Sequence, residues 1–197
     1  NTLIGKFNKY NIDGYIIPKN DEFFSEYSAN DRLKAITNFS GSAGYSIILK
    51  KKNYLFVDGR YTIQAKKEAG KRFKIIDLHK IINCNLFQNL SIGFDPKTFT
   101  SRQIKKFFHK NNKVKSIELN LIDQIHKNKV KSNKPFFSLK NKIVGENYKT
   151  KILKISKYLN KNKSDYLFVT APENVAWLLN IRGHDNPNSP IPNCQLI

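Results

Sequence analysis

Short apolar runs separated by polar turns recur along the first half of the chain. The run Gly14–Pro18 closes on a proline, which predicts a buried strand. Tyr45–Leu49 and Asn53–Val57 are two more such runs, and the three lysines between them predict the turn of a hairpin. Further strands are expected at Phe73–Asp77, Ile92–Asp95 and Ser116–Leu119.

Helices are expected between these strands, over residues 3–7, 30–36 and 62–69. Thr100 and Gln103 have the T-x-x-Q spacing of a capping box and predict the start of a further helix. Strands that alternate with helices indicate an α/β fold with helices flanking the sheet. The hairpin makes the sheet mixed rather than purely parallel.

The end of the chain repeats the order of its beginning. A helix leads into Asp13–Pro18 near the start, and another leads into Ser164–Thr170 near the end. Each copy continues with a helical segment, a glycine-containing loop and an apolar run, which in the second copy is Asn193–Ile197. This predicts one complete unit and the first part of a second. Chance similarity between two helix–strand units is the alternative.

Lysines dominate the region between the two copies. Lys127–Lys163 holds twelve lysines and one acid, Glu146, and its first part has the composition of a linker. Its second part is expected to be an amphipathic helix with four apolar residues on one face: Tyr148, Ile152, Ile155 and Leu159. The resulting division is a complete domain, a linker and the truncated start of a similar domain: 1–130, 131–143 and 144–197.

The composition, with 40% hydrophobic residues, is adequate for a packed core. No apolar run of about 18 residues is present, and the first residues lack a signal peptide's apolar stretch. We therefore expect a cytoplasmic protein without a membrane partner. Cys84 and Cys194 lie far apart and outside any C-x-x-C pair, which favours two reduced core thiols.

The formal charge of +20 raises the question of a nucleic-acid partner. Only five of the 35 cationic residues are arginine, the side chain preferred for base readout and bidentate phosphate contacts. Abundant lysine, asparagine and isoleucine are typical of an AT-rich codon bias. We interpret the lysines as solvated surface, with a basic nucleic-acid-binding protein as an alternative.

No catalytic constellation is recognisable. The four histidines lack H-E-x-x-H spacing, and the serines lack a G-x-S-x-G context. Asp58, Asp95 and Glu118 stand at strand ends, where a ribonuclease H-type acidic cluster would lie, but such acids are more often caps and turn residues. We expect no catalytic residue, metal ligand or cofactor in this chain.

Two glycine-bearing motifs flank the predicted hairpin. Gly41 and Gly44 permit a tight turn. Backbone amides of such a turn can cradle an anion, but no Walker-type lysine follows, so we favour a packing turn. In the second motif, Asp58-Gly59-Arg60-Tyr61, the acid can cap the next helix and Arg60 can pair with a carboxylate. A role for Arg60 at a subunit interface is the alternative to this structural one.

Three stretches stand out together: Asn30–Gly44, Phe56–Ala65 and Glu173–Gly183. In this order and at these spacings they resemble the three-domain Xaa-Pro aminopeptidases (aminopeptidase P) of the creatinase/prolidase superfamily. The resemblance spans nearly the whole chain. It implies a first domain with a ribonuclease H-like topology, a middle domain of similar fold, and a carboxy-terminal domain that holds two divalent metals, manganese in many members.

The resemblance also implies that this chain is the first domain plus the opening of the middle one. It would be a non-catalytic scaffold in a homodimeric enzyme that cleaves peptides with proline at the second position. Related amino-terminal domains serve in histone chaperones, so a non-catalytic peptide- or protein-binding module is the alternative.

Three residues of the middle-domain region are further candidates. Trp177 lies in an apolar run, where core packing is the ordinary interpretation and a cleft or interface position the functional one. Arg182 and Asp185 lie in a polar, proline-flanked loop. The resemblance implies that this loop faces the catalytic cleft, so we expect both residues to shape the substrate entrance.

Overall fold

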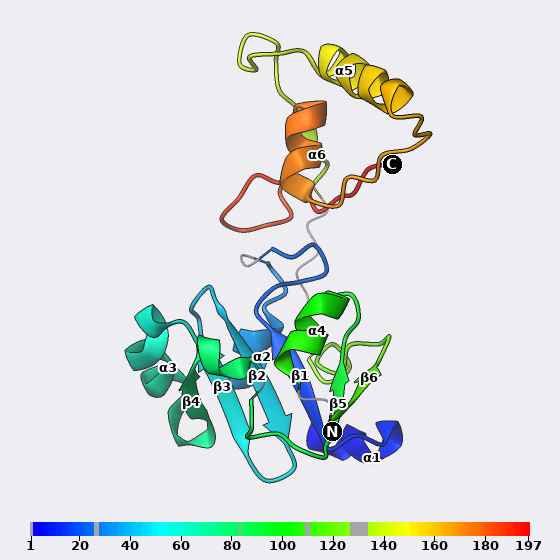
Figure 1. Cartoon of the computed structure of the whole chain (residues 1–197). Coiled ribbons are helices and arrows are strands. Elements are labelled where there is room, and N and C mark those ends of the chain that lie inside the picture. Colours follow the sequence, from blue (N-terminus) through cyan, green and yellow to red (C-terminus); the bar gives the residue numbers. More distant parts are fainter. Residues whose placement is uncertain (1, 26–27, 83, 109–110, 127–133) are drawn as a thin grey trace. The chain divides into compact units, whose positions relative to one another are not determined.

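The computed structural model describes residues 2–25, 28–82, 84–108, 111–126 and 134–197. The chain forms two compact units, shown in Figure 1. The first comprises residues 1–22 and 30–129, and the second comprises residues 23–29 and 130–197.

The first unit is built on a six-stranded sheet with the order β4-β3-β2-β1-β5-β6. The strands are β1 (Gly14–Pro18), β2 (Gly44–Leu49), β3 (Asn53–Val57), β4 (Lys74–Asp77), β5 (Ser91–Phe94) and β6 (Lys113–Ser116). β2 runs antiparallel to β1 and to β3, whereas the other neighbours pair in parallel. The mixed α/β sheet and its hairpin confirm the expectation from the sequence.

Helices cover both faces of this sheet. They are α1 (Phe7–Tyr10), α2 (Arg32–Thr37), α3 (Thr62–Ala69) and α4 (Ser101–Phe107), with short 3-10 turns η1 (Ile4–Lys6), η2 (Gly59–Tyr61), η3 (Gly70–Arg72) and η4 (Leu78–Ile81). Successive side chains of a strand point to opposite faces. Tyr15 and Ile17 therefore pack with α1, α2 and α3, while Ile16 packs with α4 and η4.

Local capping follows the sequence closely. The capping box at the start of α4 is present, with the Gln103 amide donating to the Thr100 hydroxyl at 3.2 Å. Asp31 caps α2 by accepting a hydrogen bond from the Lys34 amide at 2.9 Å. Both helix starts are set by side chains only three residues away, and for α4 the T-x-x-Q spacing predicts this capping.

The last strand of the first unit lies further upstream than expected. The prediction of a strand at Ser116–Leu119 is wrong in its bounds, because β6 is Lys113–Ser116. β6 is an edge strand and all four of its residues are exposed. An exposed edge strand needs no apolar run and is often protected by lysines. The apolar residues after β6 therefore give the stronger strand signal, although they do not form the strand.

The second unit contains helices α5 (Tyr148–Lys161) and α6 (Pro172–Leu179) and the short antiparallel pair β7 (Phe137–Ser138) and β8 (Ile181–Arg182). β7 lies within the range expected as a linker, of which residues 131–133 fall outside the described residues. The strands expected at Ser164–Thr170 and Asn193–Ile197 are reduced to one antiparallel bridge between Val169 and Leu196. An extended segment becomes a strand only where a neighbouring backbone pairs with it.

None of the described helices is long and apolar enough to cross a membrane. Both cysteines are free thiols, with Cys84 buried and Cys194 partly buried. Burial raises the pKa of each thiol.

Candidate functional site

The two glycine-bearing motifs of the first unit pack against each other. The hydroxyl groups of Tyr61 and Ser42 lie 2.9 Å apart, and the Tyr61 ring meets Phe39 edge-on at a centroid distance of 5.7 Å. A Cβ atom on Gly44 would lie 2.8 Å from the Phe56 carbonyl oxygen, and one on Gly41 would lie 2.2 Å from the Phe39 ring. The close packing requires glycine at both positions.

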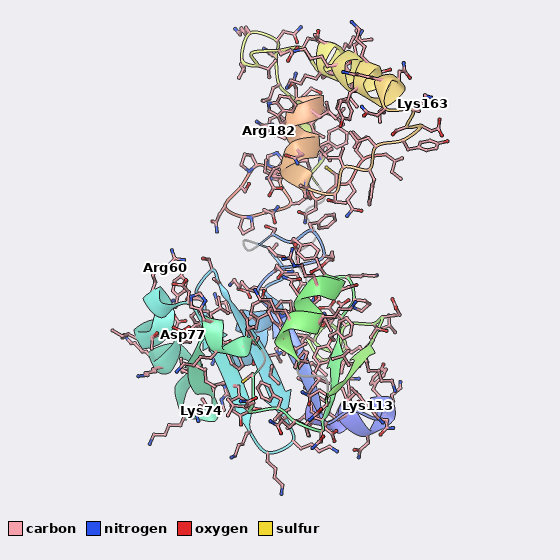
Figure 2. All side chains as sticks on the ribbon, in the orientation of Figure 1. Arg60, Lys74, Asp77, Lys113, Lys163 and Arg182 are labelled. Carbon is pink, nitrogen blue, oxygen red and sulfur yellow. The ribbon has the colours of Figure 1, made fainter. Side chains whose placement is uncertain are left out.

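Arg60 belongs to this packed region but points outward, as Figure 2 shows. Its Nε donates to Asp58 Oδ1 at 2.8 Å, and its guanidinium lies 5.4 Å from the centre of the Tyr61 ring. Asp58 also accepts the Arg60 backbone amide at 3.0 Å. The side-chain and backbone hydrogen bonds from Arg60 lower the pKa of Asp58. The arginine side chain is 73% exposed.

A carboxylate ties the glycine loop to helix α3. Glu68 accepts hydrogen bonds from the Ser40 amide at 2.7 Å, the Ser40 hydroxyl at 2.8 Å and the Gln64 side chain at 3.0 Å. Burial opposes ionisation, but these hydrogen bonds outweigh it and lower the pKa of Glu68. The loop before β2 is therefore fixed by the close packing at its two glycines and by its hydrogen bonds to the Glu68 carboxylate.

In the second unit, Trp177 is not a core residue. The core-packing interpretation is wrong, because the indole is 60% exposed while Val175, Ala176 and Leu178 of the same helix are buried. A single turn of helix cannot direct all four side chains to one side.

One face of the indole is nonetheless occupied. The Lys151 ammonium lies 4.0 Å from the centre of the Trp177 ring and donates to the Trp177 carbonyl at 2.6 Å and to Asn180 Oδ1 at 2.7 Å. Lys151 is only 5% exposed and is the buried residue of α5. It satisfies carbonyl groups at the end of α6, where the helix dipole favours a cation.

Lys151 is a buried lysine with two hydrogen bonds to α6 and its C-cap, and the sequence analysis does not single it out. The lysine run was interpreted as the solvated side of a helix, yet position 151 falls among the apolar stripe, three residues after Tyr148 and four before Ile155. A cation inside an apolar helical stripe is the signal that would have found it.

Arg182 and Asp185 are engaged with the backbone of their own unit. Arg182 Nη1 donates to its neighbour Ile181's carbonyl at 2.8 Å, and Asp185 Oδ2 accepts the Asn193 amide at 2.9 Å. Gly183 donates to the Pro190 carbonyl at 2.8 Å, so the loop after β8 is closed by its own hydrogen bonds. The structure brings Trp177, Arg182 and Asp185 into the second unit, while Arg60 belongs to the first.

The acids weighed as a metal cluster do not form one. Asp95 is buried and accepts hydrogen bonds from the Asn120 side chain at 2.8 Å and the Lys97 amide at 2.9 Å, as a turn residue does. Among the residues that the structure describes, no group of three or more His, Cys, Asp or Glu side chains is arranged to hold a metal ion. The side chains described here do not fit a dinuclear metal centre, which needs several converging carboxylates.

Comparison with known families decides the relationship. Residues 1–125 match the family model of the creatinase/prolidase N-terminal domain, and residues 126–197 match a second model with the same description. The chain belongs to the creatinase/prolidase family. This confirms the resemblance carried by the three sequence stretches, and both matches describe N-terminal domains.

Members of the creatinase/prolidase family align along nearly the whole chain. The probable Xaa-Pro aminopeptidase P of Coprinopsis cinerea is 30% identical, over 93% of this chain and 32% of that protein. The one from Laccaria bicolor is 31% identical, over 93% of this chain and 31% of that protein. A solved X-prolyl aminopeptidase from Caenorhabditis elegans, described as cytosolic with a di-nuclear active site, superposes with a TM-score of 0.85 at 26% identity, over 98% of this chain and 36% of that one. The chain thus spans about a third of the length of these relatives.

Proposed function

We propose that this chain is the amino-terminal, non-catalytic part of an Xaa-Pro aminopeptidase. One observation carries the proposal: 98% of the chain superposes on a solved X-prolyl aminopeptidase, but accounts for 36% of it. The chemistry would then belong to the remaining two thirds of the protein. That part would hold two divalent metals, manganese by resemblance, and hydrolyse peptides with proline at the second position in the cytosol.

We propose further that the second unit is the first part of a domain similar to the first unit. Two details support this division. Helices α2 and α6 both end in an asparagine with left-handed backbone, Asn38 at φ 64° and Asn180 at φ 55°. The segment before each helix also pairs antiparallel with the segment after it, β1 with β2 and Val169 with Leu196.

The role proposed for this part is to support the catalytic domain, line its cleft and contribute to a homodimer. Apolar surface on the second unit supports it. Tyr166 is 80% exposed and Phe168 is 55% exposed, and Phe168 lines one pocket together with the exposed Trp177. Apolar clusters of this kind mark surfaces that another part of an assembly covers.

The test compares this chain with the full-length gene product in hydrolysis of an Xaa-Pro peptide with added Mn²⁺. We expect activity in the full-length protein alone. Hydrolysis by residues 1–197 alone would show that this chain contains a catalytic site, contrary to the proposal. If neither protein hydrolyses the peptide, the assignment as an aminopeptidase is wrong.

The entrance role of Arg182 and Asp185 is tested in the full-length protein. Arg182→Ala is expected to lower kcat/KM on proline-containing peptides, whereas Arg102→Ala, an exposed arginine on α4, serves as the control. Unchanged kcat/KM in the Arg182 variant would remove this residue from the substrate entrance.

A further inference from the structure

The loop that follows β8 in the second unit forms one wall of a pocket of about 560 Å³. Phe137 of β7 and His184 of the loop also line it, with ring centroids 5.5 Å apart and ring planes tilted by 36°. Every lining residue belongs to the second unit. The geometry of the pocket therefore does not depend on where the first unit lies.

Hydrogen bonds within the second unit fix the walls of this pocket. The pairing of β7 with β8 sets Phe137 beside the start of the loop. The Gly183 amide donates to the Pro190 carbonyl at 2.8 Å, and Asp185 Oδ2 accepts the Asn193 amide at 2.9 Å. The lining side chains are thus carried by a backbone that is held in place, as a binding site requires.

Asn186 lines the pocket and has one polar atom without a partner. The residue is 8% exposed. Its Nδ2 donates to the Ile191 carbonyl at 3.2 Å and to Asn193 Oδ1 at 3.0 Å. A backbone carbonyl can only accept a hydrogen bond, so the amide nitrogen must face Ile191 and the orientation of the Asn186 side chain is fixed. Asn186 Oδ1 is buried, and no residue that the structure describes donates to it.

A buried acceptor without a donor is energetically unfavourable and rare in folded proteins. The missing donor at Asn186 Oδ1 points to a ligand that carries an N–H or O–H group. Because this oxygen is covered, the ligand must displace part of the pocket wall to reach it. Pro187 and Asn188 follow directly in the sequence and are exposed, so they are the part of the wall most easily moved.

The rest of the lining restricts the molecule that carries this donor. Rings make up much of the lining, from Phe137, His184, Pro187 and Pro190. Such surfaces pack against apolar side chains and proline rings of peptides. Lys134 adds a positive charge, and among the residues that the structure describes no acid lines the pocket. A carboxylate on the ligand is therefore favoured.

We propose that this pocket binds the carboxy-terminal end of a short peptide. The last amide N–H of the peptide donates to Asn186 Oδ1, its last side chain packs against Phe137, and its terminal carboxylate lies toward Lys134. A peptide end combines the amide donor, the apolar side chain and the negative charge that the lining calls for. The choice of a peptide over other ligands with these groups rests on the proposed function, in which the protein acts on peptides.

The test uses N-acetyl-Pro-Phe as the probe, titrated into this chain by isothermal calorimetry. Its phenylalanine carries the only amide N–H, because an acylated proline has none. We expect saturable binding to the parent chain. Methylation of the phenylalanine nitrogen should weaken binding by about tenfold, the effect of about one lost hydrogen bond. Replacement of the carboxylate by an amide should weaken it by a similar factor.

The matched protein variants are Phe137→Ala and Tyr158→Ala. Phe137→Ala should weaken binding of the probe, whereas Tyr158→Ala should leave it unchanged, because Tyr158 is a 66% exposed aromatic residue of the same unit that does not line the pocket. Circular dichroism checks that both variants stay folded. If Phe137→Ala unfolds, the comparison with the N-methylated probe decides on the parent chain.

Absence of binding, or binding that N-methylation of the probe leaves unchanged, would overturn the inference, since attraction by positive charge alone does not depend on that N–H. Calorimetry also separates this inference from the proposed function. If the full-length protein hydrolyses Xaa-Pro peptides but does not bind the probe, only this inference is wrong. If it binds the probe but hydrolyses no Xaa-Pro peptide, only the proposed function is wrong.

Discussion

Gly44 and Gly59 differ in what a side chain would meet at each position. A Cβ at Gly44 would strike the Phe56 backbone oxygen, whereas one at Gly59 would have open space. We predict that Gly44→Ala destabilises the first unit by about 1–3 kcal/mol, because strand β3 must shift. Gly59→Ala should stay within about 0.5 kcal/mol of the parent. Urea unfolding followed by circular dichroism measures both, and equal losses would contradict the packing argument.

Lys151 is predicted to stabilise the second unit despite its charge. In Lys151→Met, Asn180 Oδ1 loses its donor and the Trp177 carbonyl keeps only the longer bond from the Asn180 amide at 3.4 Å, at a cost of about 1–3 kcal/mol for the buried acceptor left unpaired. Trp177 fluorescence during urea unfolding reports this unit directly. Lys154→Met is the matched control, because its ion pair with Glu146 at 2.5 Å involves a lysine side chain that is 67% exposed and such pairs contribute little. A Lys151 variant as stable as the control would show that the buried ammonium is dispensable.

At the scale of elements, Glu68 links helix α3 to the loop before β2 and should make that link depend on pH. Its folded pKa is lowered, while the unfolded value is about 4.3. The carboxylate therefore contributes its full stabilisation above the unfolded pKa, and this is lost as the pH falls through the lower folded pKa. We expect the difference in urea midpoint between the parent and Glu68→Gln to shrink on acidification from neutral pH. A difference that does not change with pH would indicate that the carboxylate's charge is not involved.

The whole molecule carries a charge of +20, made of 30 lysines and five arginines against 15 acids. We predict that any binding to duplex DNA is non-specific. It should weaken steeply as salt is added, because released counterions drive it, and it should not discriminate between sequences. Titration of two unrelated duplexes at low and physiological salt measures this. A sequence preference that persists at physiological salt would favour the nucleic-acid-binding alternative over the aminopeptidase proposal.

Assembly is also decided at this scale. The second unit exposes Phe168 and Trp177, whereas the first strand of the first unit, β1, is buried along its whole length. β1 has neighbours on both sides, β2 and β5, whereas within the part of the chain that the structure describes Val169 pairs with Leu196 alone. Whether an apolar segment is buried thus depends on strands that are distant in sequence.

Features that depend on neighbours along the chain follow from the order of the residues. The capping box at Thr100 and the hairpin of β2 and β3 both involve residues a few positions apart, so their spacing predicts them. The family can be predicted for a similar reason, because each of the three stretches that carry the resemblance is continuous in sequence.

Features that depend on distant partners follow from the tertiary fold. It buried Lys151 against the end of another helix, turned Trp177 outward, and made β6 an exposed edge in place of the expected Ser116–Leu119. It also joined Arg32 to Asp123 across 91 residues. Burial and ion pairing are set by which surfaces meet, and a pattern of hydrophobic and polar positions does not specify that.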